Sequence, residues 1–359
     1  MSHYHTLPVA TVEPETREAV VVGFEVPPEL EGTFGFLAGQ HVNVRAQIAG
    51  SGEVRRSYSI CSAPGEAVLR IAIKRHPGGV FSNWANDQLR PGMGLDLMPP
   101  AGLFHVPLDA SAARRHLAIA AGSGITPVLS LIQATLRDEP RSQFTLFYGN
   151  RASSTILFRN LLADIKDCHL ERFTLVHVMS REQQDLELLN GRLTPEKVEG
   201  LLRHWGPLEA MDAIYICGPG SMNRDLSDVL QRQGYPKGQI KVEQFAVSRQ
   251  GSVPVASAAA ASAEANITEA TLILDGRHHR FPVVRGKESI LDAGLRAGLD
   301  LRHSCKSGVC ATCRAKLVEG EVDMDGNFAL EDYEIARGYV LTCQSFPVTP
   351  RVTVDFDTD

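Results

Sequence analysis

The first third of the chain shows short runs of alternating apolar and polar positions, each ended by glycine or proline. Examples are VATVEP from Val9, HVNVRAQI from His41 and VLRIAIKR from Val68. Alternation with a period of two predicts half-buried strands, and closely spaced turn residues favour antiparallel pairing between neighbouring strands. We therefore predict an antiparallel β-barrel over residues 1–108.

The pattern changes near residue 110, where apolar strands begin to alternate with helical segments. RRHLAIAAGSGITPVLSLIQATL is typical of a buried strand, a glycine turn and a helix, with Thr126 as the expected N-cap and Pro127 as the first helical residue. The runs QFTLFYGN, FTLVHVMSRE and AIYICGPGSMNRDL repeat the alternation. A repeated βα pattern predicts a doubly wound parallel sheet over residues 109–248, with ligands at the carboxyl ends of its strands.

Residues 249–266 are rich in Ala, Ser and Gly and are predicted to be a flexible linker, although the alanine run would also allow a short helix. A third domain, residues 267–359, is predicted beyond it. TLILDGRHHRFPV predicts a hairpin with Asp275 and Gly276 as its turn, and SILDAGLRAGL predicts a helix. RAKLVEGEVDM is expected to form one strand, LEDYEIARG a short acidic helix, and YVLTCQSF and RVTVDFD the closing strands.

Composition is that of a globular protein with more than one domain. A chain of 359 residues is longer than one domain of ordinary size, and 43% of its residues are hydrophobic. No uncharged apolar run approaches the roughly 20 residues of a membrane helix, and MSHYHTLP lacks the features of a secretory signal, so we expect a cytoplasmic protein with no membrane partner. The net charge of −6 argues against a nucleic acid partner.

Four of the seven cysteines follow the spacing C-x4-C-x2-C-x29-C. They are Cys305, Cys310, Cys313 and Cys343. This is the plant-type pattern for a [2Fe–2S] cluster held by four thiolates. A zinc site or two disulfides are alternatives, but structural zinc usually takes two paired knuckles and disulfides need an oxidising compartment. Small neighbours, Ser307, Gly308 and Ala311, would let backbone N–H groups approach the cluster, and we predict these four cysteines as its ligands.

Two motifs in the predicted barrel have the features of a flavin site. R-x-Y-S at residues 56–59 ends a strand, and HPGGVFS at residues 76–82 precedes a helical stretch. A flavin needs an aromatic face, a guanidinium for its phosphate and a close backbone approach, and these residues supply all three. Together the motifs resemble the flavin domain of the ferredoxin–NADP reductase superfamily.

This resemblance implies roles for six residues. Arg56 would pair with the flavin phosphate, Tyr58 would lie against the isoalloxazine, and Ser59 would hydrogen-bond near the reactive N5. The pyrophosphate would be contacted by Gly78, Gly79 and Ser82. The expected cofactor is FAD, with FMN as the alternative.

Glycine turns at two predicted strand ends are similar to the nucleotide domain of the same superfamily. GSGITP at residues 122–127 departs from the Rossmann G-x-G-x-x-G at its last position. It does resemble the superfamily's G-x-G-x-x-P turn, which implies cofactor contacts from Gly122, Gly124 and Thr126. CGP at residues 217–219 resembles a second turn, which implies that Cys217 lies near nicotinamide C4, where hydride leaves, and that Gly218 contacts the cofactor. An inert core thiol is the alternative for Cys217.

Ser180 and Arg181 end a strand where the adenine ribose is expected to lie. A carboxylate at this point favours NAD, whereas a hydroxyl and a guanidinium suit the 2′-phosphate of NADP. The SRE sequence resembles that of NADP-specific members, so NADPH is predicted; Glu182 leaves a solvated turn as the alternative. Phe245 belongs to a segment similar to the E-x-F that closes this domain in the superfamily, and it would either shield the flavin or lie in the core.

The order of hairpin, helix, cluster loop and returning strands over residues 267–359 is similar to a plant-type ferredoxin, a small β-grasp fold. SCKSGVCATC and VRRSYSICSAP also resemble the reductase components of bacterial phenylacetyl-CoA epoxidases, which reduce a separate diiron oxygenase. The resemblance implies an NADPH-dependent reductase that passes single electrons through flavin and cluster to such an oxygenase. A flavin is needed between them because hydride carries two electrons and a [2Fe–2S] cluster accepts one. Alternatives are a reductase for another oxygenase or a hybrid-cluster protein, and a redox-sensing adaptor.

Seven carboxylates lie within the sixteen residues from Glu319 to Glu334, between the third and fourth cysteines. They are Glu319, Glu321, Asp323, Asp325, Glu331, Asp332 and Glu334. Such a field would steer a basic partner and raise its association rate. We predict that this acidic segment forms part of the docking face for the oxygenase; a solvated helix and turn is the alternative.

The purified protein is expected to be brown-yellow, with flavin bands over broad cluster absorption and about two irons per chain, because each iron takes two of the four thiolates. Metal analysis checks this, and zinc in place of iron would contradict it. Cys343→Ser is expected to lose the cluster and to keep flavin reduction by NADPH, since the flavin and nucleotide motifs precede the predicted linker.

Overall fold

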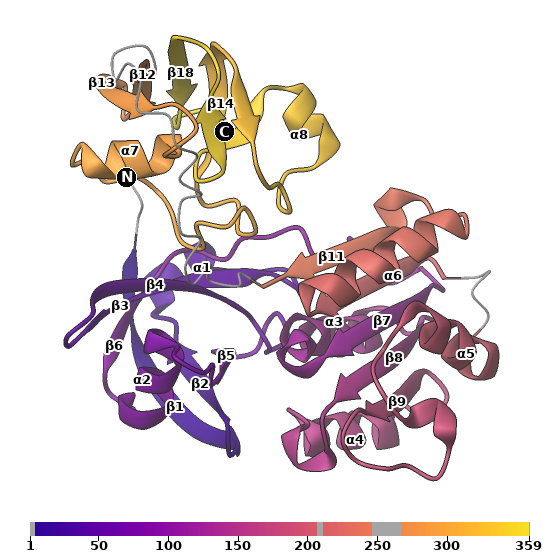
Figure 1. Ribbon diagram of the computed structural model, residues 1–359. Helices are drawn as coiled ribbons and strands as arrows, with labels where there is room; N and C mark the ends of the chain where they lie inside the picture. The colour runs from indigo at the N-terminus through magenta and orange to yellow at the C-terminus, as the bar shows by residue number, and fades with distance from the viewer. Residues whose placement is uncertain (1–3, 207–210, 246–266, 359) are drawn as a thin grey trace. The chain divides into compact units, whose positions relative to one another are not determined.

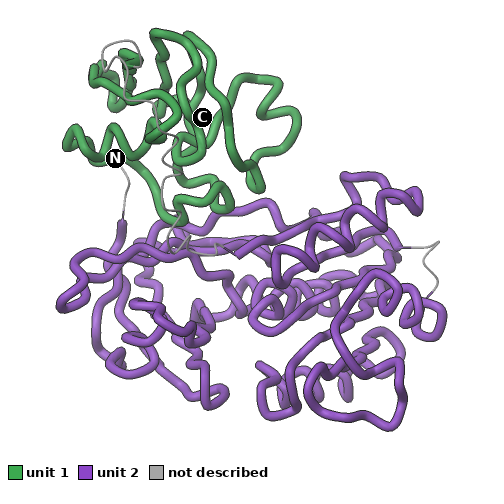
Figure 2. The backbone as a smooth tube through the Cα atoms, in the orientation of Figure 1, with its two compact units in different colours: residues 1–3, 246–359 green, residues 4–245 purple. Residues whose placement is uncertain are grey.

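The computed structural model describes residues 4–206, 211–245 and 267–358. These residues form two compact units, one spanning Tyr4–Phe245 and the other containing residues 267–358 (Figure 2). Within the first unit we refer to residues 4–108 as the flavin lobe and to residues 109–245 as the nucleotide lobe, after the ligands predicted for them. The predicted linker, residues 249–266, lies outside the described residues. Within the described ranges, no helix is long and apolar enough to cross a membrane.

The flavin lobe is a six-stranded antiparallel sheet in the order β4-β3-β6-β1-β2-β5 (Figure 1). A bridge between Ile60 and Ile71, and a hydrogen bond of 2.8 Å from the Cys61 N–H to the Arg70 carbonyl, bring its two edges together. The predicted antiparallel barrel is therefore confirmed. Its strands are β1 (His5–Thr16), β2 (Ala19–Glu25), β3 (His41–Ile48), β4 (Gly52–Ser59), β5 (Val68–Lys74) and β6 (Gly94–Leu97), and its helices are η1 (Pro28–Leu30), α1 (Glu31–Phe34) and α2 (Val80–Gln88).

Strand β2 is buried on both faces, which explains its nearly continuous apolar sequence AVVVGFE. Val20, Val22 and Phe24 pack inside the barrel. Ala19 and Val21, on the opposite face, join a core that extends into the nucleotide lobe. The two lobes therefore share packed apolar residues.

The nucleotide lobe is a five-stranded parallel sheet in the order β11-β10-β7-β8-β9, which confirms the doubly wound prediction (Figure 1). The strand order reverses between β7 and β10, and the crevice at such a point is where α/β sheets bind ligands. The strands are β7 (Arg115–Ala121), β8 (Gln143–Asn150), β9 (Phe173–Met179), β10 (Ala213–Gly218) and β11 (Ile240–Gln244). The helices are η2 (Gly122–Gly124), α3 (Ile125–Asp138), η3 (Ser153–Thr155), α4 (Arg159–Cys168), η4 (Glu187–Leu189), α5 (Pro195–Trp205), α6 (Gly220–Arg232) and η6 (Lys237–Gln239).

Helix α3 (Ile125–Asp138) begins two residues earlier than predicted. Gly124 is its N-cap, and Thr126 is its second residue, with a hydroxyl that donates to the Ser123 carbonyl at 3.0 Å. The prediction of Thr126 as N-cap and Pro127 as first helical residue was therefore wrong. The physical reason is that the glycine turn η2 is itself helical and runs directly into α3, so no extended N-cap residue separates them.

The second unit has a five-stranded sheet in the order β13-β12-β18-β14-β16 and a separate pair, β15-β17. The predicted hairpin turn is present, with Asp275 at φ 50° and Gly276 at φ 71°, and β18 pairs in parallel with β12. RAKLVEGEVDM forms two strands instead of one, because the left-handed Gly320, at φ 83°, interrupts the strand, and β14 and β15 pair in different sheets. The elements are β12 (Ile267–Leu274), β13 (Arg277–Val284), α7 (Ile290–Arg296), β14 (Arg314–Glu319), β15 (Val322–Met324), α8 (Asp332–Ala336), β16 (Tyr339–Leu341), β17 (Ser345–Pro347) and β18 (Arg351–Asp355).

Candidate cofactor sites

The end of strand β4 carries the residues that were predicted to meet the flavin ring. Ser59 is buried, and its hydroxyl has no hydrogen-bond partner among the described residues. His41 lies directly opposite Ser59 in the ladder, and its Nε2 is likewise buried and without a partner there. Buried polar groups without partners are costly, so these two atoms fit a site that a polar ligand completes. Sequence reasoning missed His41, because an isolated histidine in a strand carries no motif.

Tyr58 and Arg56 lie on the same strand. The Tyr58 ring is half-buried, 5.6 Å from the Phe81 ring at an interplanar angle of 38°. Burial raises the pKa of Tyr58, so the phenol stays neutral. Arg56 is exposed, and its Nη1 donates to the Arg55 carbonyl at 2.7 Å. The strand therefore presents an aromatic ring and an exposed guanidinium, as the flavin prediction requires.

The turn before helix α2 has the features of a phosphate cradle. Gly78 takes the left-handed conformation at φ 71°, and Gly79 is the N-cap of α2 with no side chain bonded to the helix start. The first N–H groups of α2 are thus available to an anion. Ser82 differs from expectation, since its hydroxyl accepts the His76 N–H at 3.1 Å and so organises the turn itself. A phosphate contact from Ser82 stays a prediction.

Two turns meet at the point where the nucleotide sheet reverses its strand order. Gly124 ends the turn after β7, and a Cβ there would overlap the carbonyl oxygen of Cys217 at the end of β10 and lie 3.2 Å from its Sγ. The Tyr148 hydroxyl donates to the Gly122 carbonyl at 2.9 Å and fixes the other end of the turn. The structure therefore brings Gly122, Gly124, Cys217 and Gly218 together, and only glycine at position 124 allows this approach.

Burial disfavours charged side chains around Cys217. Cys217 is fully buried, and burial raises the pKa of its thiol well above the usual range. Glu243 pairs with Cys217 across β10 and β11, and desolvation raises the pKa of Glu243 to about 8. Glu243 was not predicted as a site residue, although a carboxylate at the end of an apolar strand is a signal that could have identified it. Phe245, just beyond β11, is half-buried and packs against the core that the two lobes share.

Ser180 and Arg181 follow the last residue of β9, and both side chains are exposed. Their N–H groups donate to the Asn150 carbonyl at 2.9 Å and the Arg151 carbonyl at 2.8 Å, which continues the pairing of β9 with β8. The carboxylate of the next residue, Glu182, accepts the Ser153 N–H at 2.7 Å. The turn thus offers a hydroxyl and a guanidinium, and its carboxylate is already occupied.

The four predicted cluster ligands lie in two pairs. The Cys305 and Cys310 side chains are in hydrogen-bond contact, and so are those of Cys313 and Cys343. Among the described residues, no three His, Cys, Asp or Glu side chains gather as ligands for a single metal ion. Two pairs of thiols fit a [2Fe–2S] cluster, in which each iron takes two cysteine sulfurs.

Backbone strain in the loop between these cysteines shows how tightly it curves. Lys306 and Ala311 are left-handed at φ 53° and 52°, as is Gly308 at φ 76°. The Ser307 N–H donates to Cys305 Sγ at 3.4 Å, and the Thr312 hydroxyl donates to Cys310 Sγ at 3.0 Å. The hydrogen bonds from Cys310, first, and then from the Ser307 and Val309 backbone lower the pKa of Cys305, and the contact with Cys305 raises the pKa of Cys310. Cys305 is therefore the member of this pair that ionises first.

The acidic segment Glu319–Glu334 is less uniform than its sequence suggests. Five of its carboxylate residues are exposed and Glu331 is half-buried, but Glu334 is buried. Glu334 pairs with the Arg314 guanidinium at 2.7 Å and accepts the Glu331 N–H at 3.0 Å as part of the capping box of α8. Its expected place on a docking face was therefore wrong, because this carboxylate stabilises the helix start. The exposed members are Glu319, Glu321, Asp323, Asp325 and Asp332.

Comparison with known proteins identifies all three regions. Residues 7–106 match the oxidoreductase FAD-binding domain, residues 118–228 the oxidoreductase NAD-binding domain, and residues 272–348 the 2Fe-2S iron-sulfur cluster binding domain. The chain is 43% identical to one component of the 1,2-phenylacetyl-CoA epoxidase of Escherichia coli (strain K12), over 99% of each chain. It belongs to the family of ferredoxin reductases that carry FAD and a [2Fe–2S] cluster.

One further relative agrees with this assignment, and one solved structure shares the fold. The ferredoxin reductase component of a Rhodococcus rhodochrous 3-ketosteroid-9-alpha-monooxygenase is 31% identical, over 98% of this chain and 96% of that one. The structure of phthalate dioxygenase reductase aligns with a TM-score of 0.59 at 23% identity, covering 98% of each chain, and shows the same fold. The predictions of FAD, NAD(P)H and a [2Fe–2S] cluster as cofactors, and of an electron-transferring oxidoreductase, are confirmed.

Gly124→Ala is expected to lower stability by about 1–3 kcal/mol and to slow flavin reduction by NAD(P)H strongly, because the new methyl group displaces the Cys217 turn. Gly238→Ala is the matched control, since a Cβ there meets nothing within 4 Å. Thermal unfolding and stopped-flow reduction of the flavin measure the two effects. Equal behaviour of the two variants would show that the turns do not need their close approach.

Proposed function

We propose that this ferredoxin reductase takes hydride from NADPH and delivers single electrons to the diiron oxygenase of a cytoplasmic phenylacetyl-CoA epoxidase. The observation that carries the proposal is the 43% identity to a component of the E. coli epoxidase, an identity that covers all three domains. When bound, FAD accepts both electrons of a hydride and releases them singly to a one-electron acceptor. The chain itself supplies the sites that hold the donor, the flavin and the cluster.

We propose that Ser59 and Cys217 form the hydride-transfer site. Ser59 would lie at the flavin N5, and Cys217 would lie at the nicotinamide C4. Ser59 supports this because its buried hydroxyl has no partner among the described residues. Cys217 supports it because it ends a strand at the reversal point of the sheet and touches the glycine turn. Burial disfavours the charged forms of Cys217 and Glu243, so neither group would place a full negative charge beside the neutral dihydronicotinamide ring from which hydride leaves.

NADPH is proposed over NADH from the chemistry of the turn after β9. The exposed Arg181 guanidinium and the Ser180 hydroxyl suit a phosphate group. The carboxylate of Glu182, which would otherwise accept a ribose 2′-hydroxyl, is bonded to Ser153. The turn is therefore better matched to a 2′-phosphate than to a free hydroxyl.

A reductase for another oxygenase is the second candidate, since the Rhodococcus ketosteroid monooxygenase component also aligns over nearly the whole chain. Reconstitution distinguishes the two. We expect NADPH-dependent epoxidation of phenylacetyl-CoA when the reductase is mixed with the matching diiron oxygenase. Rapid cytochrome c reduction without any epoxidation would indicate a different acceptor, and the absence of both activities would favour a sensing role.

Arg181→Ala is expected to lower kcat/KM for NADPH about ten- to a hundredfold and to leave NADH nearly unchanged, because a charge-assisted bond to a phosphate contributes about 1.5–3 kcal/mol. Steady-state reduction of ferricyanide with each nucleotide measures the ratio. Equal losses for NADPH and NADH would assign Arg181 to the structure of the turn instead.

A triple variant, Glu321→Gln with Asp323→Asn and Asp325→Asn, is expected to slow electron delivery to the oxygenase and to flatten its salt dependence. The reason is that these exposed carboxylates steer a basic partner, an effect screened within about 3 Å at 1 M salt. Flavin reduction by NADPH should stay unchanged. Asp185→Asn with Glu171→Gln and Glu187→Gln removes the same charge from the nucleotide lobe as a control. Delivery that is as fast and as salt-sensitive as in the parent protein would remove the acidic segment from the docking face.

A further inference from the structure

The segment Ser153–Phe158 lies between the turn that carries Arg181 and the flavin lobe. At its first residue, the carboxylate of Glu182 accepts the Ser153 N–H at 2.7 Å and lies 2.6–2.7 Å from the Ser153 hydroxyl. These hydrogen bonds, from the hydroxyl first and then the N–H, hold the pKa of Glu182 below its usual range. Glu182 is therefore ionised and directed at Ser153, and the turn before it is fixed with Arg181 exposed.

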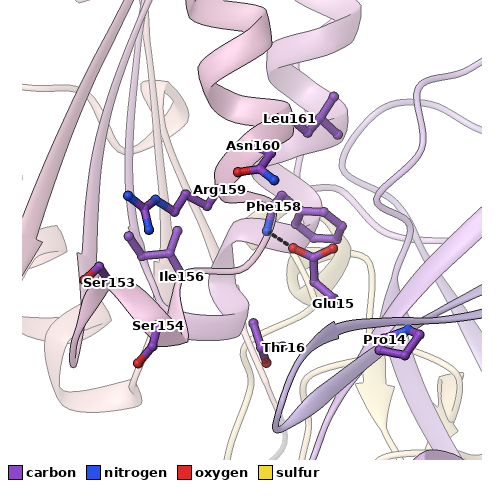
Figure 3. A pocket seen from close by; sticks show the side chains of 10 residues that line it. All are labelled: Pro14, Glu15, Thr16, Ser153, Ser154, Ile156, Phe158, Arg159, Asn160 and Leu161. Atoms are coloured by element: carbon purple, nitrogen blue, oxygen red, sulfur yellow. Dashed lines mark hydrogen bonds between the residues drawn. The ribbon is translucent and has the colours of Figure 1, made fainter.

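The last residue of the segment is hydrogen-bonded to the flavin lobe. The Phe158 N–H donates to Glu15 Oε1, on strand β1, at 2.5 Å, the contact drawn as a dashed line in Figure 3. Phe158 is left-handed, at φ 59° and ψ 30°, and is the N-cap of α4. This conformation is strained for a bulky residue, so the surrounding contacts must compensate. The Glu15 carboxylate provides one such contact, at a helix N-terminus that favours negative charge.

Between its ends the segment has internal hydrogen bonds, and one of its sides faces a cleft. Thr155 is bonded to the backbone of Ala152 in both directions, at 2.7 and 3.3 Å, and Ile156 and Leu157 are buried. A cleft of about 490 Å³ adjoins the segment, with Ser153, Ser154, Ile156 and Phe158 along one wall and Glu15 opposite (Figure 3). Ile156, Leu157 and Phe158 pack in the core that the two lobes share, whereas the end at Ser153 and Ser154 is not buried, so the contact with Glu182 holds the less packed end of the segment.

We propose that Ser153–Phe158 is a positioning strap for the 2′-phosphate subsite, with Glu182 and Ser153 at one end and Glu15 at the other as positioning residues. Glu182 holds Ser180 and Arg181 in place through Ser153, and Glu15 fixes the strap relative to the flavin lobe. The strap thereby sets the distance between the phosphate end of the nucleotide and the flavin. This inference rests on the proposed NADPH preference, because it acts through Arg181.

Ser153→Ala and Glu182→Gln are expected to raise KM for NADPH about three- to tenfold, with little change in kcat and none in KM for NADH. The loss is smaller than for Arg181→Ala, because the guanidinium remains and is only less well placed. Ser153→Thr keeps the hydroxyl and should restore KM. Glu187→Gln is the control, since Glu187 is an exposed carboxylate in the same connection after β9. Thermal unfolding of each variant separates a local change from loss of the fold.

Double variants test whether Glu182 acts through Arg181 and whether Glu15 and Glu182 act on the same segment. Adding Glu182→Gln to Arg181→Ala should cause no further loss with NADPH, because a positioning residue has no effect once its target is gone. Glu15→Ala should also raise KM for NADPH, and its effect should not add to that of Glu182→Gln; Glu13→Ala, an exposed carboxylate on the same strand, is the control.

The strap proposal can fail in three ways, and the measurements distinguish them. Equal effects of Glu182→Gln on NADPH and NADH, or full additivity with Arg181→Ala, would make Glu182 a purely structural residue. Arg181→Ala could lower kcat/KM for NADPH selectively while Ser153→Ala and Glu182→Gln leave KM for NADPH unchanged. That result would overturn the strap proposal and leave the NADPH preference standing. An unchanged NADPH to NADH ratio in Arg181→Ala would overturn both.

Discussion

The close packing of helix α3 against the flavin lobe is the constraint on which the rest of the first unit depends. Eleven of its residues are buried, and it starts directly at the glycine turn that meets Cys217. The Ser130 hydroxyl donates to the Ser62 carbonyl at 2.7 Å, and Arg137 donates to the Pro64 carbonyl at 2.7 Å. Both acceptors lie in the loop that follows strand β4 and Ser59. One helix thus joins the nucleotide turn to the flavin strand, which hydride transfer requires at fixed short range.

Most of the architecture could be predicted from the sequence, because the periodicity of apolar residues differs between the three regions. The barrel strands alternate with a period of two, and the inner strands of the parallel sheet are continuous apolar runs, as in Leu117–Ala120 of β7. The predictions failed where local signals were weak. Thr126 had the residue type of an N-cap but follows a turn that is already helical, and Gly320 turned one predicted strand into two.

Carboxylates were the hardest part of the site to predict, because their roles depend on burial and partners. Glu182, Glu243 and Glu334 each stand beside a motif in the sequence. The structure bonds Glu182 to Ser153, desolvates Glu243 beside Cys217, and pairs Glu334 with Arg314 at the start of α8. Neighbouring residues signal only the strand end at Glu243 and the capping box at Glu334, since Ser153, Cys217 and Arg314 come from distant parts of the chain. The four cysteines, by contrast, were predictable because their spacing alone specifies the ligand set.

The core shared by the two lobes has a consequence for folding. Ala19, Val21 and Ala72 of the barrel pack with Leu129 and Ile132 of α3, and the Phe104 ring meets Tyr215 of β10 edge-on at 5.6 Å. Elements that share one core open together, so the flavin and nucleotide lobes form a single cooperative unit. The region containing the cluster cysteines has a separate core, built around residues such as Leu272 and Val354. Heat or denaturant should therefore release the flavin and abolish nucleotide binding in one transition, and a weakened α3 would lower the midpoint of both losses together.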